Sequence, residues 1–493
     1  MNKAFSCSYY NRLKTKKYSK MTVFRKTLLI TFSLIISTII QSAADQDCQI
    51  QLEDTPSVWL GDEDDVTYCE AEPSQCSDFG LVFVCEDPSG GSLEPCANGT
   101  KVLCSVPDPI PLDDPTPSSE IRVVIYNIWE LRYLYYQNGQ RERTCRILHE
   151  LFRLRQDIDV IVFNEAFMGG CFSKFNSTVE MSTLTIRDIL VQHGFIYHTQ
   201  TVGEVRELPK FENGGVFIAS RWPIISEDET IYTEAIKTTA DALSAKGAKY
   251  ARVLKSVNGS SRYYNIFGTH LQASKGVNAD RVRVSQATEM HDLVVKLALS
   301  PEEPVIYAGD LNTNYYDREP RSNTANILKA LHALVPPIIG ELNYTTDGLL
   351  NDARDGDSAS YKDYVIYHED YLHPLTASQE ILRPRASEFF EVCIEAITPF
   401  PTYADSDRCR KTQNISDLAD HFAVIGVYKF DNKAVTTESS EPSTTNVVTH
   451  EPTESGQTTK SDTTSSIMTT DSGVTSRLCV ATFILSILSG LLF

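Results

Sequence analysis

The amino-acid sequence predicts an α/β fold with sizeable sheets, and two observations carry this prediction. The first is a series of short apolar runs that have the length and residue types of buried strands, such as Val305–Ala308 (VIYA). The second is that these runs alternate with longer stretches of helical periodicity. Strands interleaved with helices indicate sheets covered by helices and argue against a helical bundle.

The expected elements begin after residue 120. Strands are expected at residues 122–126, 159–163, 214–219, 263–268, 305–308, 364–367 and 422–427. A helix is expected at Gln140–Arg155, where Leu148, Leu151 and Phe152 fall on or near one face. Two further helices are expected at residues 279–299 and 322–334.

The N-terminal residues 1–44 are predicted to be a secretory signal peptide. They contain eight Lys or Arg, no acid, the apolar run Leu28–Ile40 and the small-residue site Ser42-Ala43-Ala44. Initiation at Met21 would leave a signal of more ordinary length. Residues 45–117 are predicted to form a small disulfide-rich module with a Pro-rich linker, and residues 118–432 hold the α/β pattern.

Cysteines and sequons agree with export. Of the twelve cysteines, ten lie between the signal and the C-terminal tail, and an even number on an exported chain indicates disulfides of undetermined connectivity. No C-x-x-C pair occurs, which argues against a zinc site. Asn-x-Ser/Thr sequons occur at five positions, Asn98, Asn176, Asn258, Asn343 and Asn414.

The C-terminal part changes composition twice. Residues 433–477 are rich in Ser and Thr and are predicted to be a disordered stalk. Residues 478–493 are mostly apolar, but a spanning helix usually needs ~20 residues. A small-residue site near Ser465–Gly473, a polar spacer and this tail are typical of a GPI-anchor signal. The prediction is an extracellular protein, anchored to the cell surface or released, with a short transmembrane helix as the alternative.

The stretch Pro304–Asn314 (PVIYAGDLNTN) is the first candidate for chemistry. Asp310 and Asn312 are two residues apart at the end of a buried strand, so both side chains would project together from its carboxyl end. A divalent cation or a phosphate suits such an oxygen-rich pair. The alternative is a simple turn, because Gly, Asp and Asn are also turn residues for local reasons.

Other strands repeat this arrangement. Polar side chains border five of the predicted strands, and they are all of oxygen or imidazole ligand types. A strand precedes Asn127, Glu165, His270 and the pair Asp310 and Asn312, whereas Asp420 and His421 stand immediately before one. Strand ends are solvated and collect polar residues anyway, but a set of this size predicts one shared site.

The motifs YNIW, FNEAF, GTHLQAS, GDLNTN, KDYVIY and ADHFAV, in this order, resemble the endonuclease/exonuclease/phosphatase superfamily typified by deoxyribonuclease I. The resemblance runs from Glu120 to roughly Phe430, and sphingomyelinases are the most similar branch. Two features resemble that branch in particular. One is His270 within THLQAS, and the other is the pair of stretches NGGVFIASRWPI and DALSAKG, the second of which contains Asp241 and Lys246. The superfamily pattern often has Gln where this chain has Asn164. The resemblance implies a four-layer α/β sandwich of two mixed sheets flanked by helices.

The resemblance also implies a metal site. Glu165 and Asn127 would bind Mg²⁺, with Glu165 as the direct carboxylate ligand and with Mn²⁺ or Co²⁺ as substitutes. Asp310 and Asn312 would hold the phosphate, the attacking water or a second metal.

The remaining roles concern proton transfer and substrate. By resemblance, His421 would be the general base, Asp363 would orient its ring, and Asp420 would support the base or the metal. His270 would face the phosphate from the other side, and the segment Asp241–Lys246 would affect activity and substrate engagement. No G-x-S-x-G or P-loop motif occurs, so direct attack by water is expected rather than a covalent intermediate.

The predicted function is Mg²⁺-dependent hydrolysis of sphingomyelin to ceramide and phosphocholine at an outer-leaflet membrane surface, by a monomer. Two alternatives are a related phosphodiesterase or phosphatase acting on nucleic acid or inositol phosphates, and an inactive surface adhesion or antigen protein. Removing residues 1–44 lowers the formal charge from −20 to −28, which gives no support to nucleic-acid binding through bulk charge. An inactive protein would be expected to have lost ligands, and this chain retains the set.

A loop near the C-terminal end of the α/β region is expected to meet the membrane. Cys393 and Cys409 could cross-link and close a loop that contains the apolar and aromatic stretch Ala396–Tyr403. Two prolines in this stretch argue against a central strand and favour an exposed tip, with Phe400 as the candidate membrane contact.

Overall fold

The computed structural model describes residues 55–61, 69–90, 96, 98–131, 138–167, 170–176, 179–204, 210, 212–317, 322–396 and 409–432. The predicted signal peptide, stalk and apolar tail lie outside these ranges, as does the predicted membrane-contact loop with Phe400. Within the described ranges, no helix combines the length and apolar character that crossing a bilayer requires.

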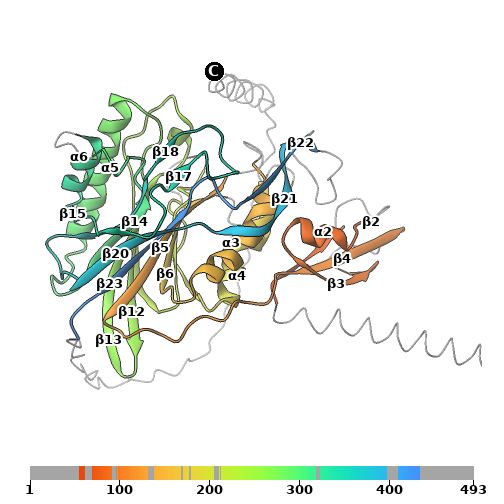
Figure 1. The fold of residues 1–493 in the computed structure, drawn as a ribbon, viewed down its shortest axis with the longest axis horizontal. Helices are drawn as coiled ribbons and strands as arrows, with labels where there is room; N and C mark the ends of the chain where they lie inside the picture. The colour runs from red at the N-terminus through yellow and green to blue at the C-terminus, as the bar shows by residue number, and fades with distance from the viewer. Residues whose placement is uncertain are drawn as a thin grey trace, which may run out of the picture.

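Two mixed sheets form the body of the molecule (Figure 1). The first has seven strands, in the spatial order β16 (Ile338–Ile339), β20 (Thr376–Leu382), β23 (Ala423–Lys429), β5 (Glu120–Glu130), β6 (Val160–Ala166), β10 (Phe217–Ser220) and β9 (Tyr197–His198). The second has six, in the order β11 (Ile224–Ile231), β12 (Gly247–Val257), β13 (Ser260–His270), β14 (Val305–Asp310), β19 (Asp363–His368) and β15 (Ala333–Leu334).

Helices cover the outer faces of both sheets. Apolar residues of α3 (Gln140–Leu154) and α4 (Ile186–Gln192) pack with the outer face of the seven-stranded sheet. Those of α5 (Val277–Lys296) and α6 (Asn323–Ala330) belong to one buried cluster with apolar residues of the six-stranded sheet. The predicted four-layer α/β sandwich is confirmed.

Most predicted strands and helices are present, with shifted ends. The strands continue past their apolar runs, so that Asn127, Glu165, His270 and Asp310 are the last or nearly last residues of β5, β6, β13 and β14. The helix predicted to end at residue 334 stops at Ala330, because the chain turns with His332 in the left-handed region at φ 50° and then joins the sheet as β15.

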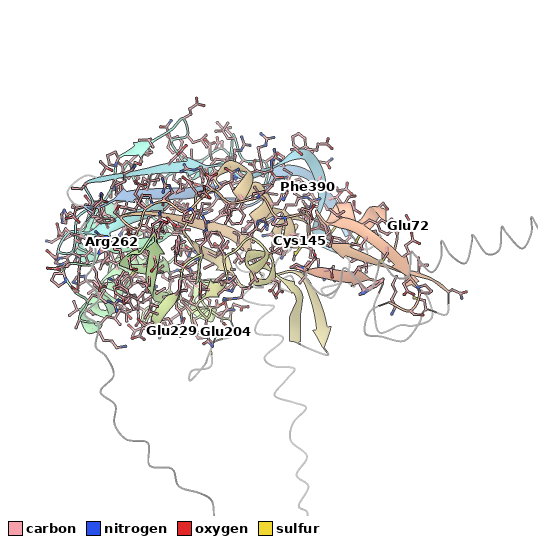
Figure 2. The ribbon with its side chains drawn as sticks, turned by 90° about the horizontal axis from the view of Figure 1, so that it is seen from below. Glu72, Cys145, Glu204, Glu229, Arg262 and Phe390 are labelled. Atoms are coloured by element: carbon pink, nitrogen blue, oxygen red, sulfur yellow. A yellow bond between two sulfur atoms is a disulfide. The ribbon has the colours of Figure 1, made fainter. Side chains whose placement is uncertain are left out.

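The N-terminal module packs on the α/β domain. It contains β1 (Ser57–Leu60), β2 (Cys69–Glu70), β3 (Val82–Asp87), β4 (Gly99–Ser105) and α2 (Ser74–Asp78), with a disulfide between Cys76 and Cys104. Its apolar side chains belong to the same buried cluster as α3. Figure 2 shows Cys145 of α3 and Phe390 on the side of the domain nearest the module, which carries Glu72.

Three hairpins complete the described structure: β7 (Gly170–Asn176) with β8 (Val179–Thr185), β17 (Thr346–Asp347) with β18 (Ala359–Ser360), and β21 (Arg385–Ala396) with β22 (Cys409–Asp417). Disulfides join Cys145 to Cys171 and Cys393 to Cys409. The second disulfide closes the β21–β22 hairpin, as predicted for the membrane-contact loop. A single-turn 3-10 helix covers Ala240–Leu243.

Candidate active site

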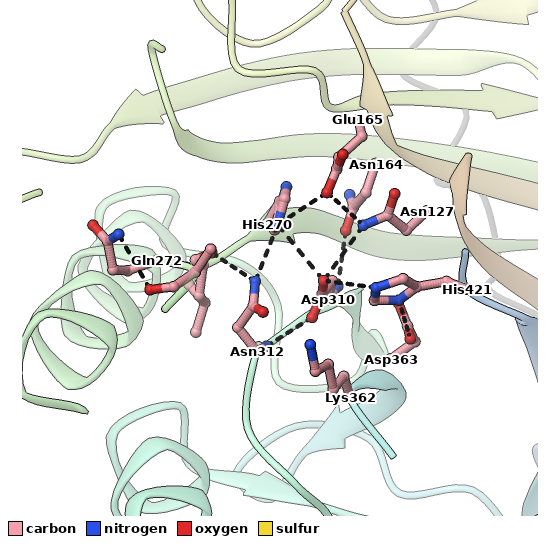
Figure 3. Close-up of polar contacts among 12 residues, drawn as sticks. Asn127, Asn164, Glu165, His270, Gln272, Asp310, Asn312, Lys362, Asp363 and His421 are labelled. Atoms are coloured by element: carbon pink, nitrogen blue, oxygen red, sulfur yellow. Dashed lines mark hydrogen bonds and ion pairs between the residues drawn. The ribbon is translucent and has the colours of Figure 1, made fainter. Parts of the chain in front are cut away.

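The strand registers bring the predicted site residues to one end of the sandwich. In the seven-stranded sheet β5 and β6 are parallel, and Asn127 is paired with Asn164, next to Glu165. In the six-stranded sheet His270 is paired with Asp310 across parallel β13 and β14, and Asp310 is paired with Asp363 across antiparallel β19. Side chains from both sheets therefore meet at the same edge (Figure 3).

Asp310 is the centre of this cluster, and its carboxylate is almost completely buried. Oδ1 accepts a hydrogen bond from the backbone N–H of Asn312 at 2.7 Å. Oδ2 lies 3.4 Å from Nδ2 of Asn127, 3.6 Å from Nε2 of His270 and 3.9 Å from Nε2 of His421. Burial alone would raise the pKa of Asp310, but His421 and His270 outweigh burial and lower it, so this carboxylate is ionised.

Glu165 faces Asp310 from the other sheet. Its Oε1 accepts a hydrogen bond from Nδ2 of Asn127 at 3.0 Å, and its backbone has φ 54°, a left-handed conformation that few residues other than Gly adopt. Burial, with a contribution from the charge of Asp420, raises the pKa of Glu165 to about 7. A carboxylate that is costly to ionise alone is well suited to bind a cation.

Asn164 joins the two sheets beneath these carboxylates. Its Oδ1 accepts a hydrogen bond from the backbone N–H of Asp310 at 2.8 Å. The residue that departs from the superfamily pattern is therefore a bridge between β6 and β14, and it leaves Glu165 free to face the site.

His421 and Asp363 form a buried hydrogen-bonded pair. Nδ1 of His421 lies 2.8 Å from Oδ2 of Asp363, and Nε2 points to the centre of the site (Figure 3). Burial alone would lower the pKa of His421, but the carboxylates of Asp363 and Asp420 reverse this and raise it to about 9. Asp363 thus fixes the ring orientation and stabilises a proton on the imidazole.

The pKa of His270 is shifted in the opposite direction from that of His421. Nδ2 of Asn312 lies 3.1 Å from Nε2 of His270, in a position to donate to it, and burial together with the charge of Lys246 lowers the pKa of His270 to about 3. This imidazole is neutral, and it faces the site from the side opposite His421 (Figure 3).

Asp241 and Lys246 form an ion pair, with 3.1 Å between Oδ1 and Nζ, next to the residues that follow His270. Nζ of Lys246 also donates to the carbonyl oxygen of Leu271 at 3.0 Å, and Oδ2 of Asp241 accepts from the backbone N–H of Ala273 at 2.7 Å. Both side chains therefore hold the chain that leaves His270.

Asp420 is held by Arg354, with 3.2 Å between Oδ2 and Nη1. Its negative charge acts on the pKa values of both Glu165 and His421. Its second carboxylate oxygen is buried without a hydrogen-bond partner among the described residues, which leaves that oxygen able to accept from a bound water or to contact a cation.

The donor set fits a divalent cation. Ligand atoms of Asp310, Asp363 and His421 all lie within 4.8 Å of one another, and Glu165 adds a further carboxylate. The metal ligands predicted from the sequence were Glu165, Asn127, Asp310, Asn312 and Asp420, and this group shares Asp310 with them. As the structure has it, Nδ2 of Asn127 faces Glu165 and Asp310, whereas Oδ1 accepts from the backbone N–H of Trp129 at 3.1 Å.

Arg143 of α3 is a residue that the sequence analysis missed. Its guanidinium is fully buried and donates to the carbonyl oxygens of Ile128, Trp129 and Leu418 at 3.1, 2.8 and 2.5 Å. It thus ties the exit of β5, just after Asn127, to the segment that leads to His421. The helical periodicity placed Arg143 in a helix, but no local signal indicates that a buried Arg serves distant carbonyls.

The fold and this set of side chains define an α/β protein whose strand ends combine a cation site with a histidine–aspartate pair. No family model matches the chain. Sphingomyelinase C of Bacillus cereus is 26% identical over 282 residues, which cover 55% of this chain and 82% of that protein. Sphingomyelinase C of Leptospira interrogans is 28% identical over 323 residues, which cover 60% of this chain and 53% of that protein. The chain is a homologue of the sphingomyelinases C, and the resemblance predicted from its motifs is confirmed.

Solved structures show the same fold. Sphingomyelinase C from Streptomyces griseocarneus is 22% identical with a TM-score of 0.50, and the match covers 64% of this chain and all of that one. A beta-toxin variant from Staphylococcus aureus, whose structure contains bound magnesium ions, is 23% identical with a TM-score of 0.50, and the match covers 63% and 99%.

Proposed function

We propose that this chain is a sphingomyelin phosphodiesterase that releases phosphocholine and leaves ceramide, by metal-assisted in-line attack of water. The observation that carries the proposal is the convergence of Glu165, Asp310 and the His421–Asp363 pair at one edge of both sheets, in a homologue of sphingomyelinase C. Sphingomyelin is the substrate named by the relatives, and it comes to this chain by that homology.

The cation is proposed to be Mg²⁺, as one side of the site is built from oxygen ligands. When bound, it would neutralise charge on the phosphoryl oxygens and stabilise the leaving oxygen. Glu165 and Asp310 would hold it, with Asn127 joining them through Oδ1 once the amide turns. The structures support a divalent cation, and Mg²⁺ in particular is the proposal.

His421 is proposed to be the general base. Nε2 faces the site, and the carboxylate of Asp363 accepts a hydrogen bond from the Nδ1–H of His421. Once His421 has lost the extra proton that the surrounding carboxylates favour, its Nε2 can take a proton from water. His270 is neutral and lies on the opposite face, where it and Asn312 would contact the phosphate. Two histidines on opposite sides of one phosphorus suit an in-line displacement.

The assay that tests this function is phosphocholine release from sphingomyelin, phosphatidylcholine and lysophospholipid vesicles, with Mg²⁺ or with EDTA, and with DNA as a further substrate. Release from sphingomyelin that requires Mg²⁺ is expected. Cleavage of DNA instead would favour the nucleic-acid alternative, and no turnover of any substrate by folded protein would favour the inactive surface protein.

We further propose that the protein acts outside the cell as a monomer attached to the outer leaflet. The disulfides at Cys76–Cys104, Cys145–Cys171 and Cys393–Cys409 support an oxidising compartment. Domain limits of 45–117, 118–432 and 433–477, a signal at 1–44 and a GPI-anchor signal at 478–493 remain proposals. A phosphatidylinositol-specific phospholipase should release the protein from expressing cells, whereas retention until detergent is added would favour the transmembrane alternative.

A further inference from the structure

The cationic side chains around the site differ in whether they form ion pairs and hydrogen bonds with the protein. Lys246 is committed to Asp241 and to the carbonyl oxygen of Leu271, and Arg354 is committed to Asp420. Lys362 is different, because no carboxylate or carbonyl oxygen of the described residues lies within ion-pair or hydrogen-bond distance of its Nζ. A cation left unpaired among several carboxylates points to a ligand that is absent from the protein itself.

The backbone of Lys362 is fixed from both sides. Its N–H donates to Oγ1 of Thr345 at 2.9 Å, and its carbonyl oxygen accepts from the N–H of Leu311 at 3.0 Å. The next residue is Asp363, the partner of His421, so Lys362 stands at the entry of β19. These contacts involve only the backbone of Lys362, and its side chain has no hydrogen bond or ion pair within the part of the chain that the structure describes.

The side chain of Lys362 is half-buried and points into the site. Figure 3 shows its amine directed toward Asp310, between Asn312 and the His421–Asp363 pair. The ammonium is therefore placed to act on the centre of the site.

We propose that Lys362 is a substrate-binding residue whose ammonium contacts a non-bridging phosphate oxygen of the phosphodiester and of the phosphomonoester product. This proposal rests on the proposed function and deepens it. A phosphate anion that enters between carboxylates needs compensating positive charge on more than one side. The cation would supply it near Glu165, and Lys362 supplies it from the β19 side. The sequence placed this residue within KDYVIY without indicating a role.

The test compares anion binding with cation binding in the same variants. Phosphocholine, inorganic phosphate and Mn²⁺ are titrated calorimetrically into the wild type, Lys362→Met, Lys362→Arg and the exposed-lysine control Lys275→Met. In Lys362→Met, phosphocholine and phosphate should bind about ten- to a hundredfold more weakly, as expected for one lost charge-assisted hydrogen bond. Lys362→Arg should recover part of the affinity, and Lys275→Met should bind like the wild type.

Cation binding should not be weakened in Lys362→Met. Removing a positive charge beside Asp310 should leave Mn²⁺ affinity unchanged or increase it, whereas a merely structural role would weaken both ligands together with the melting temperature. Equal anion affinity in wild type and Lys362→Met would overturn the proposal, as would joint loss of both ligands. Sphingomyelin turnover is measured separately: if it is absent while Lys362→Met still loses phosphate, the proposed function fails and the anion site stands. A wild type that binds neither anion contradicts the proposal for Lys362.

Discussion

Strand β19 has buried imidazoles at both of its ends, and their surroundings differ. At its start, Asp363 holds His421 with 2.8 Å between Oδ2 and Nδ1. At its end, His368 stacks with His291 and His332, with ring centroids 5.3 and 5.7 Å apart. The first environment is made of carboxylates from several strands, and the second is made of aromatic and imidazole rings.

The comparison of the two ends of β19 shows why one buried histidine holds a proton at neutral pH and the other does not. At the site end, the carboxylates of Asp363 and Asp420 overcome burial and raise the pKa of His421 to about 9. At the far end, burial and the neighbouring ring of His291 lower the pKa of His368 to about 4, although Asp370 opposes them. Burial is common to both ends. The arrangement of carboxylates decides which ring carries an exchangeable proton.

The largest expected effect is at the site end. His421→Ala should lower kcat for phosphocholine release by about 10²–10⁴-fold, the range for a well-placed general base. As a control at the far end, His332→Ala removes a ring that is about half exposed and should leave kcat unchanged. Steady-state kinetics on folded variants check both, and near-normal turnover by His421→Ala would remove it from the base role.

A comparable loss is expected from the cation ligand. Glu165→Gln should abolish metal-dependent hydrolysis with an unchanged circular dichroism spectrum, because a neutral amide loses most of the attraction for a divalent cation. The exposed Glu302→Gln serves as the control. Titration with Mn²⁺ separates the steps, and wild-type metal affinity in Glu165→Gln would show that the ligand lies elsewhere.

Binding of a divalent cation should release a proton from the site. With pKa values of about 7 for Glu165 and about 9 for His421, the cation-free site holds extra protons near neutral pH. A divalent cation should expel about one of them, so metal affinity should rise with pH between about 6 and 9. Calorimetry in two buffers of different ionisation enthalpy measures this, and buffer-independent heats would contradict it.

A smaller loss of activity is expected when the ion pair between Asp241 and Lys246, next to His270, is broken. Lys246→Met removes the ammonium that holds Asp241 and the carbonyl oxygen of Leu271, so it should lower kcat/KM for sphingomyelin by about tenfold, the cost of one charge-assisted hydrogen bond. The same change at exposed Lys275 should have no effect. Equal rates for the two variants would show that the ion pair does not position His270.

The smallest effect belongs to the far end and concerns stability. His368 has a folded-state pKa of about 4, below its unfolded value of about 6.5, so the unfolded chain binds more protons below pH 6.5. Stability should therefore fall as the pH drops from about 6.5 toward 4, by about 2 kcal/mol at pH 5 for this group. His368→Phe should reduce that loss in urea unfolding at pH 7 and 5, and parallel curves for both proteins would refute it.

The sequence was informative where chemistry is local. Apolar runs followed by polar residues predicted the strands that carry Asn127, Glu165 and Asp310, and the motifs predicted that they meet. The predicted ends of the strands were less accurate, because backbone pairing continues past the apolar run. In β5, for example, the strand continues to Glu130. The helix predicted to residue 334 ends early, since β15 gains pairing with β19 instead.

Contacts between residues far apart in the chain could not be predicted from the sequence, for physical reasons. The carbonyl oxygens that Arg143 binds come from segments as far apart as Ile128 and Leu418, and hydrogen bonds of this kind leave no periodicity. The amide orientation of Asn127 and the position of the Lys362 amine likewise depend on how the two sheets face each other. Packing, not composition, determines these features.

The central claim is that a divalent cation binds between the two sheets, with the His421–Asp363 pair beside it as the base. Crystals grown with Mn²⁺ and the product phosphocholine, measured for anomalous scattering of manganese, test it most directly. The account predicts an anomalous peak within about 2–2.5 Å of carboxylate oxygens of Glu165 and Asp310, with Nε2 of His421 not coordinated. A peak coordinated by His421 and Asp363 without Glu165, or no peak at this edge of the sheets, would contradict it.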